Sequence, residues 1–298
     1  MIRRPPRSTQ GVSSAASDVY KRQGVYYTKS NGGKLLDATS GLWCVNAGHG
    51  RKEISRAIKK QIELIDYSPA FQMGHEKVFC LAENLSNILP KNINKIFFTN
   101  SGSEAVETSL KIVHHYYALL GKKEKRIIIG RERSYHGVNY GGISVSGIQN
   151  NRNNFGPLIT QIKHLPHTHN LEKNSFSRGQ PKWGEHLADN LENIIKKFSS
   201  KRIAAVIIEP IAGSTGVHIP PLGYLQKIRK ICNKYNILLI FDEVITGFGR
   251  TGNAFASNAF KINPDIIVLA KGLTLSLIHI SEPTRRTPSS YAVFCLKK

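Results

Sequence analysis

The sequence lacks any long apolar run: its longest stretches, such as AAVII and ILLIF, fall far short of the roughly 18 residues that span a bilayer. Apolar residues nevertheless make up 40% of the 298 positions, which excludes a disordered chain, a collagen and a coiled coil. The composition therefore predicts a globular protein with a large hydrophobic core and argues against an integral membrane protein.

Cysteine is also scarce. The chain has four, Cys44, Cys80, Cys232 and Cys295, and they lie far apart without a CxxC pair. This spacing argues against a disulfide framework and against a zinc knuckle. A reducing, cytoplasmic compartment fits the cysteine content best.

Acidic residues are few: 20 Asp and Glu stand against 42 Lys and Arg, so the net charge is +22. Such an excess is typical of proteins that bind nucleic acid or anionic membranes. The lysines are scattered along the chain, however, without a basic stripe interleaved with aromatic residues and without a nucleic-acid-binding motif. We therefore expect neither nucleic acid nor membrane as a partner.

The two ends of the chain differ from the rest. Residues 1–23 are rich in Arg and Ser, as in a transit peptide, but form no amphipathic pattern. Residues 275–298 have no clear period and interrupt a strand-then-lysine motif. Both strings resemble translated sequencing-adapter DNA, so we expect them to be foreign to the fold. Residues 24–50 are then an N-terminal segment, and residues 51–274 an incomplete large domain.

Between these ends, strand patterns alternate with helix patterns. VYYT and KLLDAT are typical of short strands, and residues 51–65 carry apolar side chains at helical spacing. After a strand at 95–99, one helical stripe follows: Val106, Leu110, Val113, Tyr117 and Leu120. GYLQKIRKICNKYN is typical of a crossover helix.

Continuous apolar runs, typical of strands buried on both faces, lie at residues 126–130, 204–209, 237–242 and 265–271. Together with the helices they predict an α/β fold around a mostly parallel sheet, whose ligands gather at the carboxyl ends of the strands. We interpret residues 146–190 as a long surface excursion from this domain.

The predicted strands end in polar residues: Thr99 with Ser101, Glu209, Asp242 with Glu243, and Lys271. A lysine at the end of an apolar strand can be desolvated, which favours the neutral amine that forms a Schiff base with an aldehyde. A nearby carboxylate can hold a pyridinium nitrogen protonated. The SGSE turn, with a helix predicted to start at Ser103 and Glu104, offers backbone N–H groups to a phosphate. Together these features match pyridoxal 5'-phosphate.

Three of these sequence features, taken singly, also fit other interpretations. Lys271 alone is also typical of a lysine that closes a strand. ILLIFDE fits the magnesium-binding strand of P-loop ATPases, but the chain has no GxxxxGK[ST] motif. Residues 247–252 match GxGxxG, yet no new strand precedes them and no long helix follows, which argues against an NAD-dependent dehydrogenase.

Two further motifs favour loops over sites. His164, His167 and His169 lie close together, but a proline separates them and no carboxylate is adjacent, so we predict no metal site. Residues 212–216 are similar to a serine-hydrolase elbow, but they lack its first glycine. We interpret them as a glycine-rich loop.

With these residues in hand, the middle of the chain resembles class III, or omega-amino-acid, aminotransferases of fold type I. The motifs cover essentially all of residues 24–274 in family order: SGLWCVNAGHGRKEI, DYSPAFQMGH, FFTNSGSEAVET, YHGVNYGG, HLPHT, EPIAGSTGV, GYLQKIRKIC, NILLIFDEVITGFGRTG and DIIVLAKGLT. Within the family, their wording is most similar to the beta-alanine:pyruvate transaminases.

The resemblance implies how residues 51–274 bind pyridoxal 5'-phosphate. Lys271 is expected to form the Schiff base with the cofactor and then to act as the base and acid of the 1,3-proton shift. Asp242 is expected to pair with the pyridine nitrogen, while Val244 and Tyr135 pack on opposite faces of the ring.

The remaining implied roles concern the phosphate and the substrate. The phosphate is expected to lie against Ser101, Gly102 and Ser103. Glu209 is expected near the ring without direct contact, and Trp43 in the substrate pocket, although a core tryptophan is also typical. Phe71 is expected to reach the site of a neighbouring subunit in a homodimer or higher homo-oligomer.

The reaction implied is ping-pong transfer of an amino group from beta-alanine, or another omega-amino acid or amine, to pyruvate, which yields alanine and a semialdehyde. Two alternatives stay open: a 4-aminobutyrate or other class III transaminase with a different acceptor, and a non-catalytic cofactor-binding fragment. The family's phosphate-binding Thr and carboxylate-binding Arg lie beyond the lysine. We therefore expect this 298-residue chain to be poorly soluble and essentially inactive, while its parent gene encodes a working enzyme.

Overall fold

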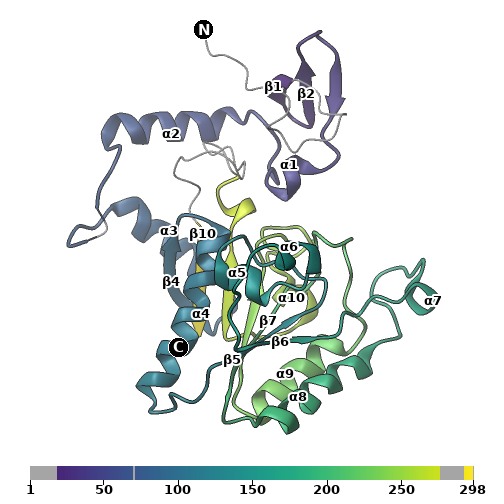
Figure 1. The fold of residues 1–298 in the computed structure, drawn as a ribbon. Helices are drawn as coiled ribbons and strands as arrows, with labels where there is room; N and C mark the ends of the chain where they lie inside the picture. The colour runs from purple at the N-terminus through teal and green to yellow at the C-terminus, as the bar shows by residue number, and fades with distance from the viewer. Residues whose placement is uncertain (1–18, 70, 276–291, 298) are drawn as a thin grey trace. The chain divides into compact units, whose positions relative to one another are not determined.

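The computed structural model describes residues 19–69, 71–275 and 292–297, in two compact units that divide after Tyr67 (Figure 1). The first unit contains an antiparallel sheet of three strands: β1 (Val19–Gln23), β2 (Tyr26–Lys29) and β3 (Lys34–Leu36). Two helices follow: α1 (Ser40–Trp43) and α2 (Lys52–Leu64). The short strands and the helix expected from the sequence of this region are confirmed.

The second unit is built on a seven-stranded sheet with the order β4-β10-β9-β8-β7-β5-β6. Its strands are β4 (Ile93–Thr99), β5 (Ile127–Arg131), β6 (Ile162–Leu165), β7 (Ile203–Ile208), β8 (Leu238–Asp242), β9 (Ile266–Leu269) and β10 (Ala292–Lys297). In the described sheet, β10 runs antiparallel to both β4 and β9, and the other neighbouring strands pair in parallel. The mostly parallel sheet of the predicted α/β fold is confirmed.

Helices cover both faces of this sheet (Figure 1). The helices of this unit are α3 (Glu76–Ile88), α4 (Gly102–Leu119), α5 (Tyr140–Val145), α6 (Gln149–Asn153), α7 (Leu171–Asn174), α8 (Asn190–Phe198), α9 (Tyr224–Lys234) and α10 (Ala256–Phe260), with short 3-10 turns at Glu185–Asp189 and Lys271–Leu273.

The apolar runs of the central strands follow from this double cover. Along β7, Val206 and Ile208 pack against α8 and α9, while Ala205 and Ile207 face the core beneath α4. Because both faces of the strand are covered by helices, neither set of alternate positions is polar. Burial of both faces is the main stabilising term of the domain.

Three expectations about elements were wrong. The surface excursion at 146–190 contains β6, an edge strand that pairs in parallel with β5. Its sequence is Ile-Lys-His-Leu, and only Leu165 is fully buried, because an edge strand is only partly covered. Leu120 is not in the buried stripe, since it caps the end of α4 and is 50% exposed. The start of α4 is two residues earlier than expected, with Ser101 as its N-cap.

Most of the two adapter-like end segments, residues 1–18, 276–291 and 298, lies outside the described residues. The described parts of those segments contribute β1 and β10. The predicted boundaries at 23/24, 50/51 and 274/275 stay predictions.

Candidate active site

The first turn of α4 lies directly after β4, at the carboxyl edge of the large sheet. The Ser101 hydroxyl accepts a hydrogen bond from the Glu104 N–H (3.1 Å), and the Glu104 carboxylate accepts one from the Asn100 N–H (2.8 Å). These two bonds resemble a capping box and fix the chain as it enters the helix. The amides of Gly102 and Ser103 have no acceptor within the helix, so they are available to an anion.

Gly102 is where three strand ends meet. A Cβ atom built on this glycine would lie 3.3 Å from Cβ of Ala270 and 3.3 Å from Cγ2 of Val244. Ala270 follows β9 and immediately precedes Lys271, and Val244 follows β8. The start of α4 is therefore packed against the two loops that carry Lys271 and Asp242.

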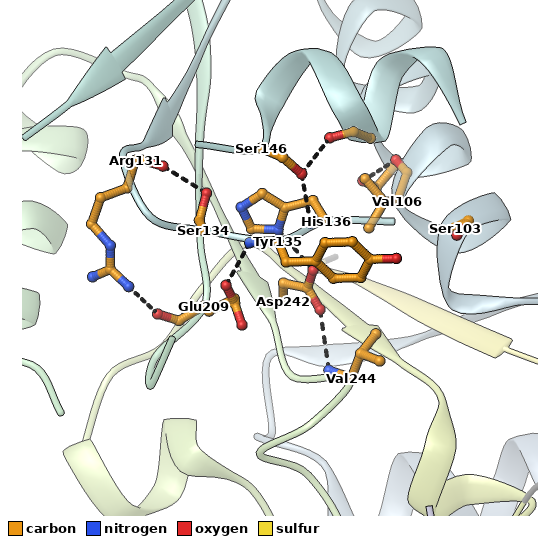
Figure 2. Close-up of polar contacts among 12 residues, drawn as sticks. Ser103, Val106, Arg131, Ser134, Tyr135, His136, Ser146, Glu209, Asp242 and Val244 are labelled. Carbon is orange, nitrogen blue, oxygen red and sulfur yellow. Dashed lines mark hydrogen bonds and ion pairs between the residues drawn. The ribbon is translucent and has the colours of Figure 1, made fainter. Parts of the chain in front are cut away.

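The Asp242 carboxylate is buried at the end of β8 and is held by two donors. Oδ1 accepts from the Val244 N–H at 3.2 Å, and Oδ2 lies 2.8 Å from Nδ1 of His136 (Figure 2). Since an ionised carboxylate only accepts, Nδ1 of His136 carries the proton in this contact. The imidazole of His136 is itself fully buried.

Tyr135 and Val244 flank that carboxylate. In the view of Figure 2, the Tyr135 ring lies on one side of Asp242 and the Val244 side chain on the other. Burial, followed by the negative charge of Asp242, raises the pKa of the Tyr135 hydroxyl. Tyr135 therefore stays a neutral aromatic surface at physiological pH.

Glu209 follows β7 and is buried, with 4% of its surface exposed. Its Oε1 accepts from the Tyr135 N–H at 2.8 Å and its Oε2 from the Gly213 N–H at 3.0 Å. Burial raises the pKa of the Glu209 carboxyl, and the charge of Asp242 adds to this, while His136 and the two backbone donors oppose it.

Lys271 begins the short 3-10 turn after β9 and is half-buried. In the register of the sheet, Asp242 on β8 pairs with Val268 on β9, three residues before Lys271. The backbone at Lys271 has a φ of 43°, in the left-handed region that few non-glycine residues adopt. A strained backbone of this kind persists only when the surrounding structure fixes it.

The predicted roles of Trp43 and Phe71 stay predictions. Trp43 is half-buried in α1 of the first unit, and Phe71, on the segment before α3, is 80% exposed. Glu243 points away from Asp242, because its carboxylate accepts from the Thr246 hydroxyl and from the N–H groups of Ala256 and Ser257.

Two buried residues of this edge were missed by the sequence reasoning. Arg131, at the end of β5, donates from Nη2 to the Glu209 carbonyl oxygen at 3.0 Å. His136 contacts Asp242, which lies 106 positions away in the chain. The only signal for His136 is its place beside Tyr135 in the YHG motif, and Arg131 has none.

The donors and acceptors of this edge fit a group that has a phosphate, a basic ring nitrogen and an aldehyde. Free helix amides and the Ser103 hydroxyl suit the phosphate, the buried carboxylate suits a protonated nitrogen, and an amine stands at the end of β9. Among the described residues, no three His, Cys, Asp or Glu side chains are placed to hold a metal ion. In the same part of the chain, no helix is long and apolar enough to cross a membrane.

Comparison with known proteins agrees with this chemistry. The sequence pattern of the family described as aminotransferase class III matches residues 8–291. The chain belongs to the class III aminotransferases. It is 55% identical to an omega-aminotransferase of Caulobacter vibrioides over 91% of this chain and 60% of that protein. It is 47% identical to a beta-alanine–pyruvate aminotransferase of Pseudomonas aeruginosa over 85% of this chain and 56% of that protein.

Solved structures of class III relatives match the fold as well. An (S)-enantioselective omega-transaminase from Thermomicrobium roseum has a TM-score of 0.86 at 34% identity, over 95% of this chain and 61% of that one. An amine transaminase from an uncultivated Pseudomonas species, described as PLP-bound, has a TM-score of 0.86 at 32% identity, over 97% and 64%. Class III aminotransferases depend on pyridoxal 5'-phosphate. The chain spans about 60% of the length of these relatives.

Proposed function

We propose that the protein is a pyridoxal 5'-phosphate-dependent transaminase that moves the amino group of beta-alanine, or of another omega-amino acid or amine, to pyruvate. The observation that carries the proposal is the packing of Gly102 against Val244 and Ala270. This packing joins the anion-binding end of α4 to the loops of Asp242 and Lys271. The residues that the cofactor needs therefore come from three strands and meet at one edge.

When bound, pyridoxal 5'-phosphate supplies an aldehyde that captures an amine and a ring that withdraws electrons from it. The Lys271 amine would attach the cofactor and would then carry a proton from one carbon atom to another. The Asp242 carboxylate would hold the ring nitrogen protonated, with the His136 N–H fixing its orientation.

The other residues would hold the cofactor in place and keep water out. Tyr135 and Val244 would lie against the two ring faces. The amides of the first turn of α4 and the hydroxyl of Ser103 would bind the phosphate, whose charge the helix dipole stabilises. The Ser101 and Ser103 hydroxyls each accept one backbone hydrogen bond, from Glu104 and from Val138, and each keeps an O–H that can donate to the phosphate.

The names of the relatives support pyruvate as the acceptor. An omega-amino acid–pyruvate aminotransferase of Pseudomonas putida is 49% identical, and a putrescine–pyruvate aminotransferase of Pseudomonas aeruginosa is 41% identical. A diaminobutyrate–2-oxoglutarate transaminase of Halomonas elongata is more distant, at 35%. We propose that the enzyme acts in the cytoplasm, and the unpaired Cys44, Cys80 and Cys232 agree with a reducing compartment.

A homodimer is part of the proposal. The segment before α3 and the first turn of this helix expose large apolar side chains: Phe71, Met73, Val78 and Phe79 are 80%, 62%, 40% and 64% exposed. A second copy of the chain would cover this surface and bring Phe71 to the neighbouring site.

Borohydride reduction tests the cofactor site. The purified chain is incubated with pyridoxal 5'-phosphate, reduced and mapped by peptide mass spectrometry, with Lys271→Ala as the control. Modification concentrated on Lys271 supports the proposal, and modification spread over surface lysines in a folded sample would contradict it.

A substrate panel tests the reaction. With protein made from the parent gene, beta-alanine, 4-aminobutyrate and taurine are each paired with pyruvate and with 2-oxoglutarate, and alanine or glutamate is measured. Faster transfer to pyruvate supports the proposed acceptor, and equal rates with 2-oxoglutarate would contradict it. Cofactor attachment at Lys271 without any transfer would favour the non-catalytic cofactor-binding alternative.

A further inference from the structure

The segment from Tyr135 to Val138 has no regular secondary structure, although it carries the aromatic ring and the imidazole of the site. Side chains from other elements bind its backbone N–H groups in place of a helix or sheet. Tyr135 N–H donates to Glu209 (2.8 Å), His136 N–H to the Ser146 hydroxyl (2.8 Å) and Val138 N–H to the Ser103 hydroxyl (3.1 Å). Its conformation is thus set by tertiary contacts.

Glu209 is the one carboxylate among these three acceptors, and it binds two loops at once. Its Oε1 accepts from Tyr135 and its Oε2 from Gly213, in the loop after β7. Both oxygens are used as acceptors, so an amide in place of the carboxylate would oppose its NH2 to one of the two N–H groups.

The Glu209 backbone is held from a third direction. Its carbonyl oxygen accepts from Nη2 of the buried Arg131 at 3.0 Å. Glu209 therefore has little freedom to move away from Tyr135, and any shift of its carboxylate would be passed to the Tyr135 backbone. Figure 2 shows the consequence: the Tyr135 ring projects from this anchored point toward Asp242.

We propose that Glu209 is a positioning residue, whose carboxylate fixes the Tyr135 backbone so that the tyrosine ring lies at the correct height above the cofactor ring. This inference rests on the proposed function, since it assumes a ring between Tyr135 and Val244. It assigns to Glu209 a role that acts through Tyr135 and needs no contact with cofactor or substrate.

Glu243 offers a matched control. It is also a buried carboxylate that follows a central strand and accepts from two backbone N–H groups, those of Ala256 and Ser257. These two partners lie in α10 and a third donor, the Thr246 hydroxyl, lies after β8, so none of them belongs to the Tyr135 segment. Glu243→Gln therefore causes a comparable loss of hydrogen bonding without touching the Tyr135 segment.

The first experiment needs no cofactor. Amide hydrogen exchange is compared in the full chain, in Glu209→Gln and in Glu243→Gln. We expect the exchange of the Tyr135 and Gly213 amides to accelerate by about tenfold or more in Glu209→Gln only. Unchanged exchange of Tyr135 in Glu209→Gln would overturn this inference. Glu209→Asp, which keeps the charge but shortens the reach, carries the same comparison if Glu209→Gln does not fold.

The second experiment is a double-mutant cycle on the affinity for pyridoxal 5'-phosphate, measured by absorbance titration and by the induced circular dichroism of the bound cofactor. We expect Glu209→Gln to weaken binding about tenfold in the Tyr135 background and less than about twofold in Tyr135→Ala. Glu243→Gln should have the same effect in both backgrounds. Equal effects of Glu209→Gln in both backgrounds would show a general structural role and overturn the inference.

The two experiments separate the inference from the proposed function. Failure of the unaltered chain to bind pyridoxal 5'-phosphate would contradict the proposed function. Normal binding, with no coupling between Glu209 and Tyr135, would leave the proposed function standing and contradict only the role of Glu209.

Discussion

At the scale of single residues, both oxygens of the Asp242 carboxylate have a hydrogen-bond partner. One accepts from the Val244 N–H and the other contacts His136, and each keeps a lone pair for a further donor. These two contacts fix the orientation of the carboxylate, which is what a partner for a ring nitrogen requires. Replacement of Asp242 by asparagine, which has the same shape, should therefore be unfavourable.

We predict that Asp242→Asn lowers the free energy of unfolding by about 1–3 kcal/mol, because asparagine offers one acceptor oxygen where the structure uses two. Loss of the charge should also weaken binding of pyridoxal 5'-phosphate by at least about tenfold. Urea unfolding and absorbance titration measure the two effects. The control is Asp189→Asn, whose partly exposed ion pair with Lys227 is expected to contribute less than about 1 kcal/mol. Equal effects of the two substitutions would contradict the prediction.

The second prediction at this scale concerns Lys125, a buried lysine just before β5. Lys125 is buried, and its ammonium group donates to the carbonyl oxygens of Ile203 (2.8 Å) and Asn236 (2.9 Å). Burial, with the charge of Lys122 adding to it, lowers the pKa of Lys125 from 10.5 to about 8. The folded state therefore binds this proton less tightly than the unfolded state does.

Because the folded pKa is depressed, the contribution of Lys125 to stability is present above the unfolded pKa and is lost as the pH falls through about 8. We predict that raising the pH from 7 to 10 stabilises the unaltered chain relative to Lys125→Met by on the order of 1 kcal/mol. Urea unfolding at both pH values measures the difference. Lys123→Met, at an exposed position, should show no such change. A pH-independent difference for Lys125→Met would contradict the prediction.

The polar residues at strand ends could be predicted because each stands at a fixed place in its own segment. Asp242 and Lys271 follow apolar runs, and the geometry of a parallel sheet brings such ends together. The contacts of His136 with Asp242 and of Glu209 with Tyr135 could not be predicted. These contacts join residues 106 and 74 positions apart, and no local sequence pattern shows which carboxylate will bind which N–H group.

At the scale of elements, continuous apolar runs predicted the strands that helices cover on both faces, but they did not predict the edge strand β6. The runs at β5, β7, β8 and β9 are buried on both faces, so their positions are apolar except for Arg131 and Asp242 at the ends of β5 and β8. In β6, only Leu165 is buried, and the polar positions hid the strand in a polar loop. The N-cap of α4 was misplaced because Ser101 and Ser103 are equally good capping residues, and only the strand ending at Thr99 decides between them.

The junction at the start of α4 yields a prediction for the element as a whole. Gly102→Ala would place a methyl group 3.3 Å from both Ala270 and Val244, closer than most such contacts, so the helix start must move away from β8 and β9. We predict a loss of about 1–3 kcal/mol in the free energy of unfolding and weaker binding of pyridoxal 5'-phosphate. Thermal unfolding with and without the cofactor measures both effects. An unchanged stabilisation by the cofactor would contradict the proposed place of the phosphate.

At the scale of the whole molecule, the fold class follows from the alternation of apolar runs and amphipathic helices, and the family from the order of motifs. Neither determines which surfaces meet another molecule. Composition did not predict an exposed apolar surface, because the net charge of +22 describes the whole chain and not one region of it. The exposed surface formed by Phe71, Met73, Val78 and Phe79 became visible only with the burial of each side chain.

We predict that the chain associates with itself through this surface and that Phe79→Lys weakens the association at least about tenfold. Covering one large apolar side chain stabilises a contact by about 1.5–3 kcal/mol, and a buried ammonium would oppose the contact further. Sedimentation equilibrium over a range of protein concentrations measures the dissociation constant. The control is Phe176→Lys, since Phe176 is more exposed than Phe79, at 101% against 64%, but lies after α7. If both substitutions weaken association equally, or if the unaltered chain stays monomeric at every concentration, α3 does not form the interface, and the expected contribution of Phe71 to a neighbouring site is wrong as well.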